Sequence, residues 1–138
     1  MYQRILYTSR ATDQVSIRSV YDIIRTAHNR NSEFGVTGGL LFLDGYFIQM
    51  LEGTPYAVQT RFSRIVRDPR HDQLTIRLNE KTPELMFPSD WMALRSKPEI
   101  AVDVFIEHRY QPGLPSDQFS GEEIKAFMAS CFFEPAVV

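Results

Sequence analysis

Two polar side chains suited to exchanging a proton lie in segments with the pattern of strands. Tyr7 stands in the run RILYTS, and Gln49 is the only polar residue between Tyr46 and Leu51. Burying a phenol or a carboxamide without a partner costs roughly 1–3 kcal/mol, so each needs a hydrogen bond. Two interpretations stay open: a mutual hydrogen bond within a structural core, or contact of both groups with a bound polar ring. Asn31, at the end of a helical segment, either adds a further carboxamide to the same space or caps the helix.

The elements that position these side chains follow from changes of period along the chain. Residues 4–9 alternate as a short strand, and from Ser16 onward apolar residues recur at helical spacing until the polar stretch 29–32. Two apolar runs then flank Asp44-Gly45, which predicts a hairpin because a type I′ turn needs positive φ at both positions.

A second helix and two further strands follow the hairpin in the predicted order. Thr54 as N-cap and Pro55 at the first helical position predict a helix that stops near Asp68. Alternation predicts strands at residues 74–80 and 91–96. The resulting order, β-α-β-β-α-β-β, indicates an α+β, ferredoxin-like fold with two helices on one face of a five-stranded sheet. Its first and third strands are adjacent and central, which would bring Tyr7 and Gln49 side by side beneath the helices.

The last third of the chain is expected to pack against this sheet. Five of the ten phenylalanines follow residue 95. Residues 98–109 fit a helix and an alternating strand equally well, whereas a capping box at Ser120 and Glu123 opens a predicted helix. The sheet face without helices would expose an apolar patch that includes Leu6, Ile48 and Met50. We expect four side chains of the last helix to cover that patch: Phe127, Met128, Cys131 and Phe132.

Composition excludes several classes of function. Seventeen acidic and fifteen basic residues give a net charge of −2, which argues against nucleic-acid binding. No apolar run approaches the ~20 residues of a membrane span, and the N-terminal residues lack the apolar region of a signal peptide. One cysteine forms no internal disulfide, so we expect a cytoplasmic protein. The three histidines lack ligand spacing, which argues against a metal site.

An ordered set of motifs points to a family. Tyr7, Asn31, GVTGGLL, FIQMLEG, RIVRDPRH and WMAL follow one another much as in BLUF domains, the blue-light sensors that use flavin, and the chain resembles that family from about residue 3 to 95. The resemblance implies a sensor domain at residues 1–95 and a C-terminal helical cap at 96–138. It also implies a non-covalent flavin, usually FAD, with FMN and riboflavin as alternatives, and no enzymatic turnover.

The family's flavin contacts transfer to positions of this chain by resemblance alone. The ring would lie between the two helices, with Asn31 on its C4 carbonyl and N3 edge and Arg64 directed at its C2 carbonyl; a solvated helix arginine is the alternative for Arg64. Asp68, Arg70 and His71 would lie near the ribityl and phosphate portion, although His71 also suits a structural role. The complete implied set is Tyr7, Ile23, Ile24, Arg30, Asn31, Gln49, Arg64, Ile65, Asp68, Arg70 and His71.

The resemblance further implies a photochemical role for Tyr7 and Gln49. Tyr7 would pass an electron and its proton toward the flavin by way of Gln49, whose carboxamide then rotates or tautomerises. The family separates a tryptophan and a methionine by one residue, whereas Trp91 and Met92 are adjacent here. Neighbours on a strand face opposite ways, so we expect Met92 to face Gln49 and leave the orientation of Trp91 open, since a bulge would bring both inward.

No effector motif follows the sensor segment, so the resemblance implies a separate downstream protein partner and a homo-oligomer. The alternative function is a non-photoactive ferredoxin-like module that binds a ligand or a partner. An acylphosphatase-like hydrolase, the third class, would need a glycine-rich phosphate cradle after the first strand, and TSRATDQVS contains none.

Overall fold

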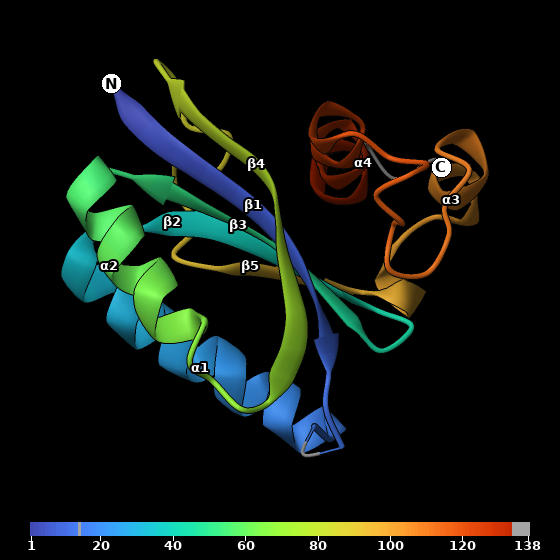
Figure 1. The fold of residues 1–138 in the computed structure, drawn as a ribbon, viewed down its shortest axis with the longest axis horizontal. Helices are drawn as coiled ribbons and strands as arrows, with labels where there is room; N and C mark the ends of the chain where they lie inside the picture. The colour runs from blue at the N-terminus through green and yellow to red at the C-terminus, as the bar shows by residue number, and fades with distance from the viewer. Residues whose placement is uncertain (14, 134–138) are drawn as a thin grey trace.

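A five-stranded sheet lies between two layers of helices (Figure 1). The computed structural model describes residues 1–13 and 15–133. Helices α1 and α2 cover one face of the sheet, and α3 and α4 lie on the other side. The elements in chain order are β1 (Tyr2–Ala11), α1 (Ile17–Phe34), β2 (Thr37–Leu43), β3 (Tyr46–Gly53), α2 (Pro55–Ile65), β4 (His71–Thr82), β5 (Ala93–Ser96), the 3₁₀ helix η1 (Lys97–Glu99), α3 (Val102–Glu107) and α4 (Gly121–Phe133).

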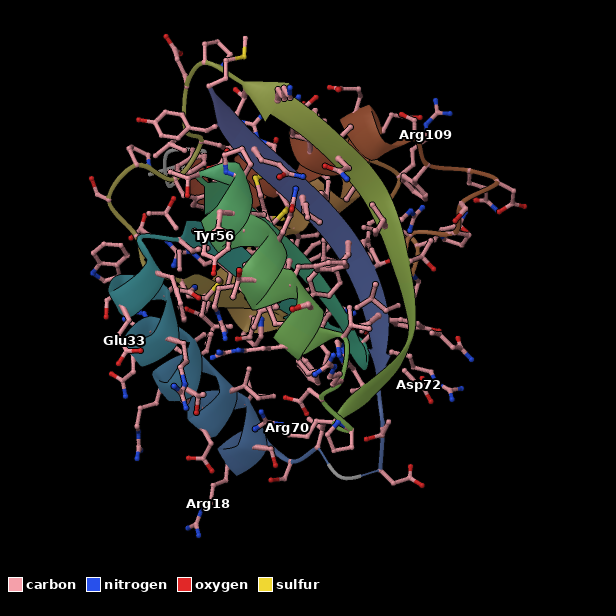
Figure 2. All side chains as sticks on the ribbon, turned by 60° about the vertical axis from the view of Figure 1, so that its left-hand side comes forward. Arg18, Glu33, Tyr56, Arg70, Asp72 and Arg109 are labelled. Atoms are coloured by element: carbon pink, nitrogen blue, oxygen red, sulfur yellow. The ribbon has the colours of Figure 1, made fainter. Side chains whose placement is uncertain are left out.

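The strand order β4-β1-β3-β2-β5 confirms the ferredoxin-like arrangement. β1 and β3 are central and antiparallel, and Tyr7 stands directly opposite Gln49 in their register. β5 joins the edge of the sheet parallel to β2. Polar residues such as Arg18 and Glu33 lie on the outer surface of α1, away from the sheet (Figure 2).

Local sequence signals fix the ends of most elements. Ser16 caps α1 by accepting a hydrogen bond from the Ser19 amide, and Thr54 caps α2 in the same way. Asp44 and Gly45 both have positive φ, as the hairpin prediction requires. The prediction that α1 ends within residues 29–32 was wrong: the helix continues to Phe34, because Gly35 is the residue that adopts the left-handed conformation that closes it.

The fifth strand is shorter than the sequence predicts. It begins at Ala93, so Trp91 and Met92 precede it instead of forming its first residues. The backbone carbonyls of both residues accept hydrogen bonds from side chains of α1, which replaces ladder pairing at these positions.

The C-terminal segment packs as a helical layer. Residues 98–109, which fitted two structures, contain the short helix α3. Ser120 and Glu123 form the predicted capping box through reciprocal backbone hydrogen bonds. Phe127, Met128 and Cys131 are buried in one core cluster with the apolar sheet residues Leu6, Ile48 and Met50, and Phe132 packs against that cluster. The predicted cover of the second sheet face is confirmed, whereas the last five residues of the predicted cap, 134–138, lie outside the described residues.

A buried ionic network joins the layers at one end of the sheet. The fully buried Glu52 carboxylate accepts hydrogen bonds from Arg4 Nε (2.7 Å) and from the amides of Met86 (3.0 Å) and Phe87 (2.8 Å). Arg4 also bonds Glu80, whose carboxylate lies 3.2 Å from Lys125 Nζ of α4. Glu52 therefore anchors the connection between β4 and β5.

We expect Arg4→Gln to destabilise the fold by about 3 kcal/mol, because it leaves the Glu52 carboxylate buried without a cation. Arg10→Gln is the matched control: Arg10 lies on the same strand and pairs with Asp72, but both partners are exposed. Urea unfolding should show a clear loss for the first variant and almost none for the control. Equal losses would contradict the role given to the buried network.

None of the helices in residues 1–13 and 15–133 has the length and apolar character that crossing a membrane requires. The same residues contain no group of three His, Cys, Asp or Glu side chains arranged to hold a metal ion.

Candidate functional site

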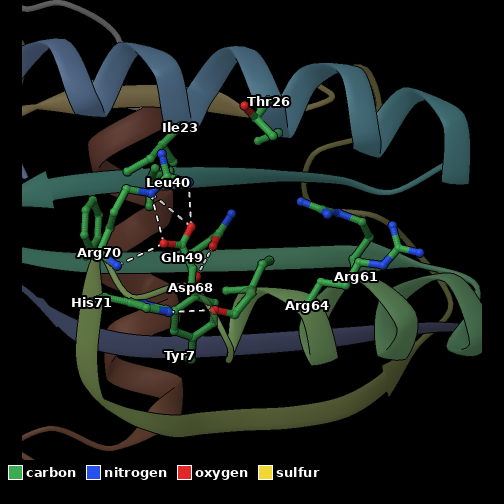
Figure 3. A pocket seen from close by; sticks show the side chains of 13 residues that line it. Tyr7, Ile23, Thr26, Leu40, Gln49, Arg61, Arg64, Asp68, Arg70 and His71 are labelled. Carbon is green, nitrogen blue, oxygen red and sulfur yellow. Dashed lines mark hydrogen bonds and ion pairs between the residues drawn. The ribbon is translucent and has the colours of Figure 1, made fainter. Parts of the chain in front are cut away.

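A cavity lies between α1, α2 and the central strands. Its empty space is about 660 Å³, a figure that includes open solvent at its mouth. Figure 3 shows the side chains around it. The lining residues are Tyr7, Ile23, Thr26, Ala27, Leu40, Phe47, Gln49, Arg61, Arg64, Ile65, Asp68, Arg70 and His71.

Tyr7 and Gln49 form a hydrogen-bonded pair in the wall that the sheet contributes. The Tyr7 hydroxyl donates to Gln49 Oε1, and both side chains are buried. Gln49 Nε2 lies 3.5 Å from Met92 Sδ, a weak acceptor. The two interpretations of this pair are therefore compatible, because the groups satisfy each other and also line the cavity.

Burial strongly raises the pKa of Tyr7, which keeps its phenolic proton in place. Two lining charges act on the same group in opposite directions. The Arg61 guanidinium lowers the Tyr7 pKa, and the Asp68 carboxylate raises it. Charged side chains of the cavity lining therefore set the electrostatic potential at Tyr7. A hydroxyl that stays protonated is suited to giving up an electron and a proton together.

The cavity walls are apolar between two charged ends. Ile23 of α1, Ile65 of α2 and Leu40 of β2 contribute aliphatic surface, which suits the faces of a flat ring. Ile24 packs instead in the core cluster between the helices and the sheet, outside the lining. Arg61 and Arg64 lie at one end of the cavity (Figure 3).

Asp68, Arg70 and His71 form the opposite end (Figure 3). Two Arg70 nitrogens bond the Asp68 carboxylate at 2.9 and 2.5 Å, and these bonds lower the Asp68 pKa. His71 Nε2 lies 2.7 Å from the Ile65 carbonyl oxygen, which only accepts, so this nitrogen carries a proton. His71 Nδ1 lies 2.8 Å from Ser9 Oγ and accepts from that hydroxyl when the ring is neutral.

Arg61 is a lining residue that the sequence did not single out. Its side chain is only 7% exposed, and its Nε donates to Asn31 Oδ1 at 2.9 Å. Burial lowers the pKa of Arg61, and the neighbouring charges of Arg64 and Arg30 lower it further. A signal was available, since Arg61 precedes Arg64 by three residues on a helix and so shares its face.

Four other residues with a predicted role are not in the cavity lining: Asn31, Arg30, Met92 and Trp91. Asn31 is fully buried, with its carboxamide bonded to Arg61 and to the Trp91 carbonyl oxygen. Arg30, the residue before it, is exposed. Met92 is buried and contacts Gln49, whereas Trp91 is 41% exposed. Apolar faces with polar groups at the edge and ends are what a flat heteroaromatic cofactor needs, so the lining fits such a group.

Comparisons with known proteins agree with this geometry. The family model described as sensors of blue-light using FAD (BLUF) matches residues 2–93. Photoactivated adenylate cyclase subunit beta of Euglena gracilis is 39% identical over 87 residues, which are 63% of this chain and 10% of that protein. The blue light- and temperature-regulated antirepressor BluF of Escherichia coli K12 is 31% identical over 94 residues, 68% of this chain and 23% of that protein.

Solved structures extend the likeness beyond the matched region. The dark-state structure of BlrB, a BLUF protein, superposes with a TM-score of 0.75 at 26% identity, covering 94% of this chain and 96% of that one. BlsA in its photo-activated state gives a TM-score of 0.84 over 100% and 99% of the two chains; its 20% identity makes this a likeness of fold. The present chain spans about a tenth of the length of the cyclase relatives.

Proposed function

This chain belongs to the BLUF family of blue-light flavin sensors, and we propose that FAD binds in the cavity between α1 and α2, where Tyr7 and Gln49 form the light-responsive pair. The observation that carries the proposal is the buried hydrogen bond from Tyr7 to Gln49 in the cavity wall. It places a good electron and proton donor next to a carboxamide, the side chain that both donates and accepts.

The lining suggests how the chain holds the cofactor. Ile23 and Ile65 would pack on the ring faces from the two helices, and Arg64 would approach its electron-rich edge. Arg70 and His71, at the other end of the cavity, would contact the polar chain that follows the ring. FMN and riboflavin share the ring, and the charged end favours FAD over riboflavin because it offers a cation to a phosphate.

A bound flavin supplies the group that absorbs blue light and accepts an electron. Tyr7 would be the residue that gives up an electron together with its hydroxyl proton, and Gln49 Oε1, which accepts the bond from that hydroxyl, would receive the proton. The carboxamide would then present a different arrangement of donor and acceptor to the cavity. Met92 biases that step: its sulfur only accepts, so a rotation that turned Oε1 toward it would lose the contact from Nε2.

The BLUF domain is a sensor and not itself catalytic. We therefore propose that this chain turns over no substrate and signals to a separate protein, with residues 1–95 as the sensor and 96–138 as a helical cap. Relatives whose names join light to an adenylate cyclase or an antirepressor support coupling to an effector. The proposed route runs from Met92 through β5 to the C-terminal helices, and self-association into a homo-oligomer forms part of the proposal.

Flavin content tests the cofactor assignment. Protein purified with its cofactor should be yellow, and chromatography of the released pigment should identify FAD. Flavin-free protein should bind added FAD and protect it from solvent quenching. A chain that takes up no flavin in either form would exclude the sensor role and favour the non-photoactive module.

Tyr7→Phe should keep bound flavin and lose the light-induced red shift, because phenylalanine has no hydroxyl proton and is a poorer electron donor. Tyr56→Phe is the control: Tyr56 lies on α2 but is 78% exposed and points to solvent (Figure 2). Absorption spectra before and after blue light measure the effect. A normal shift in the Tyr7 variant would show that another residue is the donor.

A further inference from the structure

A chain of hydrogen bonds leads from the cavity to the start of β5 without passing through Gln49. Arg61, which lines the cavity, donates from Nε to Asn31 Oδ1 at 2.9 Å. The other end of that carboxamide, Asn31 Nδ2, donates to the Trp91 carbonyl oxygen at 2.6 Å. Because Asn31 is fully buried, its two bonds fix the orientation of the amide between Arg61 and the backbone of Trp91.

The charge of Arg61 is not balanced by an ion pair within the described residues. Among the ion pairs of residues 1–13 and 15–133, none includes Arg61. The charged groups closest in effect are Arg64 and Arg30, which are also cationic. A buried guanidinium in this setting gains most from electron-rich groups in the cavity, and it responds to any change in their charge or hydrogen bonding.

The segment that receives this chain of bonds is held mainly by α1. Asn31 bonds the Trp91 carbonyl, and His28 Nε2 lies 2.9 Å from the Met92 carbonyl oxygen. The residue before this segment, Asp90, accepts a backbone hydrogen bond from the Gly38 amide of β2. Two side chains of α1 thus bond the carbonyls of Trp91 and Met92 in place of a neighbouring strand. The first residue of β5 is therefore Ala93.

We propose that Arg61 is a positioning residue that couples the cavity to the Trp91–Met92 segment through Asn31. This rests on the proposed function, in which the cavity holds the flavin. Two connections then reach the same segment: Gln49 contacts the Met92 side chain, and Arg61 acts through Asn31 on the Trp91 backbone. Through the first connection, a rearrangement of Gln49 acts on the Met92 side chain. Through the second, a change in the charge or hydrogen bonding of the cavity acts on Arg61 and so on the Trp91 backbone.

Trp91 provides the readout, because it is the only tryptophan of the chain and its side chain is partly exposed. Quenching of its fluorescence by acrylamide is measured on flavin-free protein, on FAD-loaded protein in the dark, and after blue light. The test variant is Arg61→Lys, which keeps the charge but loses the planar Nε donor. Arg67→Lys is the control, since Arg67 is exposed and lies outside the cavity lining.

Wild-type protein and the Arg67→Lys control should change their Trp91 quenching constant on FAD binding and again on illumination. In Arg61→Lys we expect both changes, compared at equal FAD occupancy, to shrink by at least about fivefold, the low end of common coupling factors between sites. In flavin-free protein, acrylamide should quench Trp91 fluorescence more readily in Arg61→Lys than in the control, because Asn31 no longer holds the Trp91 carbonyl as firmly.

One result for the variant would overturn the inference: a Trp91 quenching constant in Arg61→Lys that equals that of the control in all three states. If the variant does not fold, wild-type protein still tests the coupling between the cavity and the Trp91–Met92 segment. An absorption shift without any change in Trp91 quenching would exclude that coupling. A wild-type protein with no absorption shift refutes the proposed function instead, and the flavin-free comparison still tests the hold of Arg61 on the segment.

Discussion

Gln49→Leu is expected to retain flavin and to lose the light-induced red shift entirely. Leucine has a similar volume and would fill the space beneath the helices, but it cannot accept from the Tyr7 hydroxyl or donate to Met92. No donor or acceptor then remains to rearrange when Tyr7 is oxidised. The buried Tyr7 hydroxyl also loses its partner, so we expect a loss of about 1–3 kcal/mol in the free energy of unfolding.

Gln59→Leu is the matched control for this variant, because Gln59 is an exposed side chain of α2 outside the cavity lining. It should keep both the flavin and the shift. Light-minus-dark absorption spectra of the two variants, recorded at equal flavin occupancy, make the comparison. A shift of normal size in Gln49→Leu would refute the role given to this carboxamide.

Phe127→Ala should cost about 3–5 kcal/mol of stability, the usual range for removing a fully buried aromatic ring. Phe127 has no exposed surface, stacks on Tyr110 with ring centroids 5.5 Å apart and lies at the same distance from the His108 ring. Its loss would leave a cavity between α4 and the face of the sheet that lies behind Tyr7 and Gln49. Unfolding in urea measures the cost.

Phe133→Ala, at the end of the same helix, removes the same ring from a site that is 50% exposed, and it should cost only a small fraction of that energy. Similar small losses in both variants would mean that α4 does not form part of the core in solution. A large loss in Phe127→Ala alone would support the proposal that the C-terminal segment is a structural cap of the sensor.

Local signals in the sequence predicted the elements that need few distant partners. The hairpin at Asp44-Gly45, the Thr54 cap and the Ser120–Glu123 capping box all involve residues within a few positions of one another. Strand alternation then placed Tyr7 and Gln49 on one face, because a side-chain period of two leaves little freedom once the face of the core is known.

The sequence did not predict the hydrogen bonds between polar groups of distant segments around the start of β5. The start of β5 depends on bonds from His28 and Asn31, about 60 residues earlier in the chain, to the carbonyls of Trp91 and Met92. The partner of Asn31 is Arg61, on another helix. Hydrophobic periodicity does not predict these bonds, because it indicates which positions are buried and not which polar groups form hydrogen bonds with one another.

The buried Glu52 shows the same limit. Glu52 follows the apolar run that ends at Leu51, and the sequence did not single it out; its partners are Arg4 and two backbone amides of the β4–β5 connection. Only the sheet register and the path of that connection bring these groups together. Polar residues in apolar runs therefore indicate where a network exists, and the fold decides which residues complete it.

The most direct test of the central claim is the absorption spectrum of the full chain loaded with FAD, recorded in the dark, after blue light and after return to the dark. If Tyr7 and Gln49 rearrange around a bound flavin, the flavin absorption shifts slightly to the red on illumination and returns in the dark. A spectrum that stays unchanged, or a flavin that bleaches without any red shift, would contradict the account.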